Sequence, residues 1–384
     1  MAYHAWNGTP GGPGVTRAMY IDKVDLGPPV PTLNSGHPFQ LAQGITDIGT
    51  LPGGTSSILY SVNDAGQATG SSTTGAPGCG SLTRPISYSL DDGITELTTA
   101  ACTTNSYEGL AINQSGLIVA TGSFSPQCDF VSYPPYVPQV GINYRNRQQG
   151  TLAFHPFLAQ GSVNCGFGVN DAGEAVGVAS LKDGFDNPYR AYRWAGLGAP
   201  TDLTSSACGT CLSWAYDIDN NGESVGSWIN GVDGMRVFRQ SGLSVTQLGT
   251  IGGAQIADPI DGDRAFGTND QGIAVGYAHR TDGVHAVRWD ESGSASDILS
   301  GFYGRANAVN NHGQVVGARS TNPYLSDPIG FVWQPGKPLT LIYPPPGFNR
   351  LRIWGISDSG LIVGDIRKPD GTMHGFITEA PPPY

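Results

Sequence analysis

The chain has 384 residues, of which 56 are glycine, 28 are proline and only 13% are charged. Its formal net charge of −11 argues against nucleic-acid binding over the whole surface, and no apolar run approaches the roughly 18 residues that span a bilayer. Hydrophobic residues make up 39% of the chain and recur at fixed places, which excludes disorder and indicates many short strands joined by turns.

The first residues and the cysteines both bear on where the protein works. Met1 to Trp6 lack the basic region and the apolar core of a secretion signal. We therefore interpret this start as that of a mature chain, without its secretion signal, to which an initiating Met has been added. Six cysteines, an even number, indicate three disulfides and a secreted, extracellular or periplasmic protein, with six buried thiols as the alternative. The predicted pairs are Cys208 with Cys211, Cys79 with Cys102, and Cys128 with Cys165.

One eight-residue phrase, Asn310 to Gly317 in one of its copies, occurs seven times at intervals of about 49 residues. Such a period is typical of an array of supersecondary units. In the phrase, Asn or Asp opens a type I turn, and a glycine three residues later supplies the positive φ of a bulged hairpin. The predicted hairpins lie near residues 58–71, 108–121, 165–178, 214–227, 264–277, 305–318 and 352–365.

Between these hairpins lies a second hairpin, in which an aromatic strand is followed by a strand that ends near Leu or Ile. Residues 190–194 with 201–203 and residues 285–289 with 297–299 are examples. Each repeat therefore holds four antiparallel strands, the content of one propeller blade. The sequence predicts an all-β, seven-bladed β-propeller that forms a single domain over residues 1–384, its ring closed by pairing of N- and C-terminal strands. An open solenoid is the alternative.

Several of these segments resemble a known family. They are His285-Ala-Val-Arg-Trp, His374-Gly-Phe, Leu248 to Gly253, Ile48 to Gly54 and the Asn-x-x-Gly-x-Val-Val-Gly hairpin, and they are similar to the extracellular HAF-repeat proteins of bacteria. The resemblance covers nearly the whole chain and implies secretion and a propeller-like fold. It implies no catalytic residues, because that family carries no common catalytic motif. A long insertion over residues 124–150 departs from the family pattern.

Loop lengths indicate which face of the propeller carries the function. The turns inside both hairpins are short and share one face, whereas the connections between hairpins are long and share the opposite face. Long irregular loops on a rigid scaffold are where binding and catalysis usually lie. We therefore place the site on the long-loop face, where the insertion over residues 124–150 supplies Tyr144 and Arg145 as candidate binding residues.

The glycine of each repeat turn serves as a reference for counting along the strand before it. Eight residues earlier, where the strand leaves the long loop, stand Ile58, Glu108, Cys165, Trp214, Arg264, Arg305 and Arg352. Equal register means equal height around the ring, so the three arginines should converge at the channel mouth and bind an anionic group. Glu108 and Trp214 are candidate binding residues at the same height. The alternative is that Asp261, Asp263 and Glu108 neutralise the arginines. Large apolar residues stand six and four positions before the glycine and mainly Gly or Ala five before it, as blades stacked face to face would need.

Three side chains on the long-loop face are candidates for proton transfer. His279 lies in a long loop and has no place in the repeat, and Tyr303 and Tyr107 join it as candidate acids and bases. Four other histidines share one repeat position and are predicted to make structural hydrogen bonds: His37, His155, His285 and His374.

A partial calcium motif is the one sign of a cofactor. Asp217, Asp219 and Asn221 resemble the first half of a calcium loop, but Trp228 stands where a bidentate Glu is needed. We therefore expect no cofactor, with calcium at these residues as the alternative.

These observations predict a secreted propeller whose partner is an anionic polysaccharide or another extracellular ligand, and not nucleic acid. In its catalytic form the protein is a polysaccharide lyase, in which Arg neutralises a uronate carboxylate and Tyr or His transfers the proton. Two alternatives stay open. One is a non-catalytic scaffold that binds a glycan or a protein, and the other is a glycoside hydrolase that pairs Glu108 with Asp258, Asp261 or Asp263.

Overall fold

The computed structural model describes residues 44–75, 82–97, 107–122, 143–146, 151–154, 164–180, 189–196, 199–208, 211–229, 234–252 and 262–380. These residues form strands, turns and loops, and none of them belongs to a helix that could cross a membrane. The chain divides into two units, Met1–His37 and Pro38–Tyr384, and every described strand belongs to the second.

The strands of the second unit form seven antiparallel four-stranded sheets. The first four sheets, each given from its inner strand outward, are β2 (Ser57–Val62), β3 (Ala68–Thr73), β4 (Thr83–Ser89) and β5 (Gly93–Glu96); β6 (Tyr107–Ile112), β7 (Leu117–Gly122), β8 (Asn143–Asn146) and β9 (Thr151–Phe154); β10 (Asn164–Val169), β11 (Glu174–Ser180), β12 (Tyr189–Ala195) and β13 (Thr201–Asp202); and β14 (Leu212–Ile218), β15 (Ser224–Ile229), β16 (Met235–Ser241) and β17 (Ser244–Gln247). The remaining three are β18 (Arg264–Thr268), β19 (Ala274–Arg280), β20 (Gly283–Trp289) and β21 (Ala295–Asp297); β22 (Tyr303–Val309), β23 (Val315–Ser320), β24 (Ile329–Trp333) and β25 (Thr340–Ile342); and β26 (Arg350–Ile356), β27 (Leu361–Arg367), β28 (Met373–Glu379) and β1 (Thr46–Asp47).

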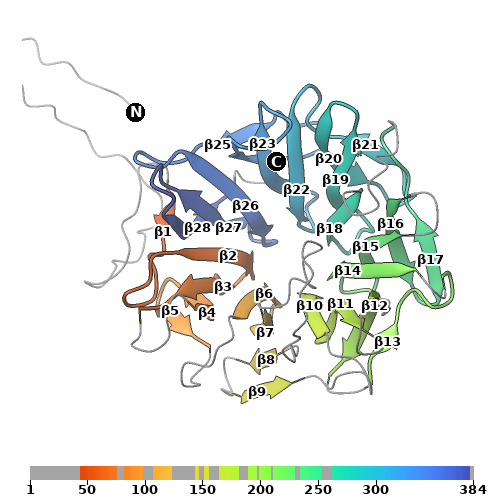
Figure 1. Cartoon of the computed structure of the whole chain (residues 1–384), viewed down its shortest axis with the longest axis horizontal. Coiled ribbons are helices and arrows are strands. Elements are labelled where there is room, and N and C mark those ends of the chain that lie inside the picture. Colours follow the sequence, from red (N-terminus) through yellow and green to blue (C-terminus); the bar gives the residue numbers. More distant parts are fainter. Residues whose placement is uncertain are drawn as a thin grey trace, which may run out of the picture. The chain divides into compact units, whose positions relative to one another are not determined.

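Neighbouring sheets pack face to face around a common centre (Figure 1). The second strand of one sheet contacts the first strand of the next, from β3 with β6 through to β23 with β26, and β27 in turn contacts β2. The last sheet takes its outermost strand from the N-terminal side of the unit, because β1 pairs with β28 through Thr46 opposite Ile377 and Asp47 opposite Phe376. The all-β class and the propeller-like arrangement are confirmed.

The repeat turns connect the sheets to one another as well as closing their own hairpins. As predicted, the seven repeat glycines have φ between 69° and 87°, a region that glycine occupies at little cost. Asn310 shows both roles of the turn. Its Oδ1 accepts the amide of Gln314 at 2.9 Å, and its Nδ2 donates to the carbonyl of Ser357 in the next sheet at 3.0 Å.

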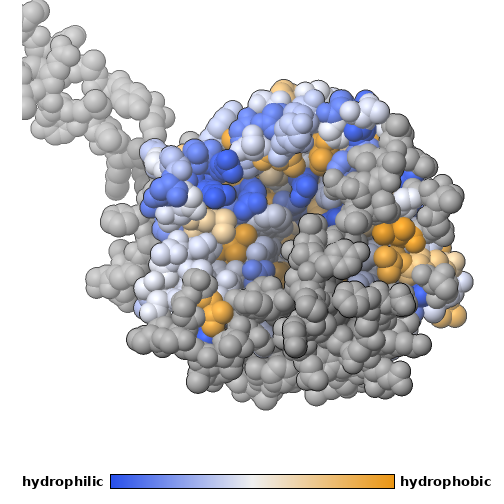
Figure 2. Space-filling model, in the orientation of Figure 1, coloured by the Kyte–Doolittle hydropathy of each residue, from blue (hydrophilic) through white to orange (hydrophobic). Residues whose placement is uncertain are grey.

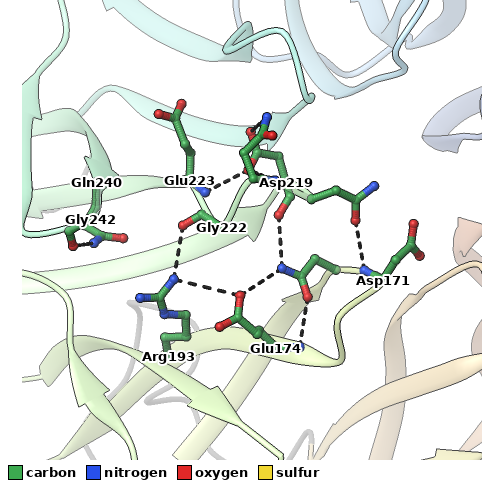
Figure 3. Close-up of polar contacts among 11 residues, drawn as sticks. Asp171, Glu174, Arg193, Asp219, Gly222, Glu223, Gln240 and Gly242 are labelled. Carbon is green, nitrogen blue, oxygen red and sulfur yellow. Dashed lines mark hydrogen bonds and ion pairs between the residues drawn. The ribbon is translucent and has the colours of Figure 1, made fainter.

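A second series of hydrogen bonds runs through the residue after each turn Asn. The amide of Asn311, for example, donates to Asp358 Oδ1 at 2.7 Å. The same type of bond joins the other consecutive turns, and Ser359 N donates to Asp64 Oδ1 at 2.7 Å, which joins the seventh turn to the first. Figure 3 shows the contacts between the turns that carry Asp171 and Asp219.

A basic residue on the third strand of several sheets pairs with an acid on the fourth. His285 Nδ1 lies 3.0 Å from Asp297 Oδ2, and His374 Nδ1 lies 2.8 Å from Asp47 Oδ2. Arg190 with Asp202 at 3.1 Å and Arg84 with Glu96 at 3.6 Å repeat the arrangement. The structural role predicted for His285 and His374 is thus confirmed, whereas His37 and His155 lie outside the described residues.

The hydrophobic core is divided into clusters that lie between adjacent sheets. These clusters combine side chains of the third strand with Val, Ile, Leu and Ala residues of the first two strands. Fully buried aromatic side chains include Trp194, Trp289, Phe238, Phe331 and Phe376. This packing holds the inner strands at fixed heights, which positions the site.

Candidate functional site

The inner strands surround a cavity of about 750 Å³, a volume typical of small-molecule sites. Each inner strand begins on the long-loop side and ends in a repeat turn, so the position along the strand sets the depth in the cavity. Most of the lining residues fall into three layers, which stand eight, six and five positions before the repeat glycine. We call them the upper, middle and lower layers.

A β-bulge in every inner strand builds the middle layer. The register between the inner strand and its neighbour shifts at the same place in all seven sheets and leaves one residue unpaired. The unpaired residues all line the cavity: Tyr60, Leu110, Phe167, Tyr216, Phe266, Asn307 and Trp354. The large side chains six positions before the glycine therefore do not pack between blades, because the bulge turns them toward the channel. The small residues five positions before it do allow the close approach of neighbouring sheets, as at Gly168 and Gly267.

Aromatic rings of the middle layer contact one another around the cavity. The ring centroids of Phe167 and Tyr216 are 5.5 Å apart, and those of Tyr216 and Phe266 are 5.4 Å apart. On the other side, Tyr60 packs against Trp354 at 6.0 Å. The Tyr60 hydroxyl donates to Glu108 at 3.3 Å, and burial, followed by the charge of Glu108, raises the Tyr60 pKa well above its usual value. Tyr60 is therefore a hydrogen-bond donor at neutral pH.

The upper layer carries the charged groups. Arg264, Arg305 and Arg352 line one cavity together with Glu108, so the structure brings together the four charged residues of the shared register. Trp214 and Cys165 hold the same register but are buried in the core, away from the described lining. Figure 2 shows hydrophilic residues gathered over the sheets of β22–β25 and β26–β28, which supply Arg305 and Arg352.

Arg352 has a carboxylate partner on the neighbouring strand. Its guanidinium makes a two-pronged contact with Asp365, from Nε to Oδ1 at 3.1 Å and from Nη2 to Oδ2 at 3.1 Å. Asp365, 1% exposed, also accepts the indole N–H of Trp354 at 2.7 Å. The alternative, in which nearby acids neutralise the arginines, thus holds for Arg352, although its partner is Asp365 and not one of the acids that were named. Asp261 lies outside the described residues.

Arg264 and Arg305 approach the same aromatic ring from adjacent sheets. The guanidinium carbons lie 6.0 Å and 4.6 Å from the centroid of Tyr277, respectively, within the range of a cation–π contact. Tyr277 stands directly opposite Arg264 in the pairing of β18 with β19. No carboxylate within the described residues pairs with Arg305, and its buried Nε has no hydrogen-bond partner among them. This guanidinium is thus held in place by an aromatic ring and keeps donors available for an anion.

Asp217 is the exception in the lower layer, where other repeats place Ser, Ala or Gly. Its Oδ2 accepts the amide of Thr268 at 2.9 Å, and Gly168 of the preceding sheet leaves room for it. The carboxyl is partly open to the channel but surrounded by protein, and this burial raises its pKa to about 7. Among the described groups, the positive charges of the three arginines outnumber the negative charges of Glu108 and Asp365 by one. Ionisation of Asp217 would cancel that excess.

The candidate proton-transfer residues are not among the described residues that line the cavity. His279 is in β19, opposite Val284, and packs against Tyr277 with ring centroids 5.4 Å apart, so its placement in a long loop is wrong. Tyr303 and Tyr107 begin β22 and β6, and the Tyr303 ring contacts His285. The described lining of the cavity includes none of the three candidates. Sequence reasoning missed Tyr60 in this lining and named Asp217 only as a candidate calcium ligand.

The remaining candidates have structural roles or lie outside the described residues. Asp219 accepts the amides of Asn221 and Glu223 in its own turn, and no group of three or more His, Cys, Asp or Glu among the described residues could hold a metal ion. Asp263 accepts the His279 amide, and Asp258 is outside the described ranges. For Tyr144 and Arg145 the structure describes the backbone in β8 but not the side chains.

The cysteine prediction is corrected at one pair. Cys208 and Cys211 are free thiols, so the predicted bond between them is not formed. The Cys211 amide donates to the sulfur of Cys208 at 3.0 Å, and burial raises the pKa of Cys211 to about 12. Cys165 is disulfide-bonded. Its predicted partner Cys128, like Cys79 and Cys102, lies outside the described residues.

Comparisons with known proteins support the fold alone. No family model and no curated protein matches the sequence. Solved structures that are similar include a puromycin hydrolase (TM-score 0.55, 11% identity, 84% of this chain and 51% of the other) and prolyl oligopeptidase B from Galerina marginata (0.57, 9%, 85% and 50%). A puromycin-hydrolyzing peptidase of Mycobacterium tuberculosis is also similar (0.52, 11%, 88% and 56%). The chain spans about half the length of these peptidases, and the similarity shows a β-propeller fold.

Proposed function

We propose that this chain is a secreted, closed seven-bladed β-propeller of the HAF-repeat type that binds an anionic polysaccharide in the cavity on its long-loop side. Four-stranded sheets, the β1–β28 pairing and the cycle of turn contacts support the closed ring. The repeated pairs of a third-strand basic residue with a fourth-strand acid support the family, because they involve the His residues that carry the resemblance.

Arg305 is the observation that carries the binding proposal. Its guanidinium lines the cavity beside Tyr277 and has no carboxylate partner among the described residues. A buried guanidinium is stable when an anion supplies the missing acceptors, and Arg pairs with carboxylate or sulfate through two parallel hydrogen bonds. The aromatic middle layer below it offers the apolar surface on which a sugar ring can pack.

Binding without turnover is the form of the function that this arrangement favours. A lyase needs a base beside the carbon next to the uronate carboxylate, and His279, Tyr303 and Tyr107 lie outside the described lining. Titratable groups other than the arginines do line the cavity. Tyr60, with its raised pKa, is a poor base at neutral pH, and Glu108 accepts the Tyr60 hydroxyl. Asp217 lies in the lower layer and accepts the Thr268 amide. The arginines therefore serve to hold the ligand.

A panel of immobilised polysaccharides tests the proposal. Polymers of glucuronate, galacturonate and mannuronate should retain the wild-type protein, while neutral polymers should not. Arg305→Gln should weaken retention by about 10- to 100-fold, the effect of losing charge-assisted hydrogen bonds. Arg367→Gln, which changes an exposed arginine outside the cavity, is the matched control and should bind as the wild type does. Retention that is unchanged in Arg305→Gln would refute the site. Appearance of the ultraviolet absorbance of unsaturated uronate ends would refute the non-catalytic form.

A further inference from the structure

Asn307 carries the one amide side chain of the middle layer, in which the other six side chains are aromatic or aliphatic. The other six bulge residues are Tyr60, Leu110, Phe167, Tyr216, Phe266 and Trp354. Asn307 follows Arg305 by two residues on β22, so both side chains face the cavity, about 6.6 Å apart along the strand. An amide at a position that otherwise takes apolar groups needs an explanation.

The orientation of the Asn307 amide is fixed by its neighbour. Nδ2 donates to the carbonyl of Ile353 at 2.6 Å, and a carbonyl can only accept, so Oδ1 is the amide atom left without a partner. The residue is 8% exposed, and Oδ1 has no hydrogen-bond donor among the described residues. A buried acceptor without a donor is costly, and natural proteins rarely leave one unmatched.

We propose that Asn307 is the specificity-determining residue of the cavity and reads a hydroxyl group adjacent to the carboxylate that Arg305 binds. This inference rests on the proposed function. The two side chains present donors and an acceptor side by side, which matches a carboxylate next to a hydroxyl on one sugar ring. Phe266 and Trp354 occupy the bulge positions of the sheets on either side, and they place apolar surface beside the amide. The ligand class is a uronate at the non-reducing end of a chain, because a sugar linked through this position has no free hydroxyl next to the carboxylate-bearing carbon to donate to Oδ1.

Ligand variation tests this without changing the protein. The methyl glycosides of glucuronate and galacturonate differ only in the orientation of the hydroxyl beside the carboxylate-bearing carbon. Wild-type protein should prefer one of them by about 10- to 100-fold, because the other leaves the buried acceptor unmatched. The 4-deoxy analogue should bind as weakly as the disfavoured epimer. Equal affinity for the two epimers and the deoxy analogue would overturn the inference.

Asn307→Leu gives the complementary test in the protein. The chain itself places Leu110 at the same bulge position, so this variant has a precedent within the fold. The variant should bind both epimers about as weakly as the wild type binds the disfavoured one, so that the preference between the two methyl glycosides falls below about 3-fold. Leu110→Val, at the same depth in another sheet, is the matched control and should keep the wild-type preference. Discrimination that persists in Asn307→Leu would contradict the role of Asn307. Absence of uronate binding in the wild type would instead refute the proposed function itself.

Discussion

Asp217 allows a quantitative test of how the channel treats charge. Replacing it with Asn keeps an oxygen that can accept the Thr268 amide and removes the ionisable group. Burial raises the pKa of Asp217 to about 7, whereas an unfolded chain gives up this proton near pH 4. Between these values the folded state holds a proton that the unfolded state has lost. The stability that this proton contributes is complete below about pH 4 and is lost as pH rises toward 7.

A shift of roughly 3 pKa units corresponds to about 4 kcal/mol. The carboxyl is partly open to the channel, so solvent reduces this figure, and we expect about 2 kcal/mol. Asp217→Asn should therefore change stability little at pH 4 and should be about 2 kcal/mol more stable than the wild type at about pH 8. Urea unfolding of both proteins across this pH range measures the difference, in which the other titrating groups cancel. A difference that is the same at both ends of the range, or larger in acid, would refute the burial of this carboxyl.

Two further predictions concern the contacts between sheets. Asn310→Asp keeps the acceptor for the Gln314 amide but places an oxygen opposite the carbonyl of Ser357, so it should lower the free energy of unfolding in urea by about 2–4 kcal/mol. His312→Asn, in the same turn, should lower it by less than about 0.5 kcal/mol. Equal effects of the two variants would contradict a stabilising hydrogen bond between Asn310 and Ser357. Gly168→Ala should lower stability by about 1–3 kcal/mol, because the new methyl carbon would lie 2.9 Å from the Asp217 Cα, and a thermal midpoint equal to that of the wild type would argue against this close approach.

The repeat turns and the shared height of the arginines could be predicted from sequence, because both depend on short spacings within one strand. The repeat glycines with positive φ and the convergence of Arg264, Arg305 and Arg352 follow from counting. The bulge could not be predicted in this way. A large apolar side chain such as Phe266 has the same character whether it faces a neighbouring sheet or a channel, and the register shift arises only when two strands pair.

Two contacts of the arginines could also have been predicted from the sequence. Asp365 stands opposite Arg352, and Tyr277 stands opposite Arg264, at the same distance across their hairpins. Continuing the count from each arginine through the turn to the partner strand would have found both contacts. By contrast, the raised pKa of Asp217 depends on burial by neighbouring sheets, and the free acceptor of Asn307 depends on the Ile353 carbonyl, so neither could be seen in one segment.

Calorimetric titration measures directly whether Arg305 holds an anionic sugar in the channel cavity. Oligomers of galacturonate and of glucuronate are titrated into the wild type and into Arg305→Gln, at low and at high salt. The account predicts binding of at least one oligomer, weaker binding as salt rises, and a loss of about 10- to 100-fold in the variant. Absence of binding to both oligomers, or equal affinity in the wild type and Arg305→Gln, would contradict it.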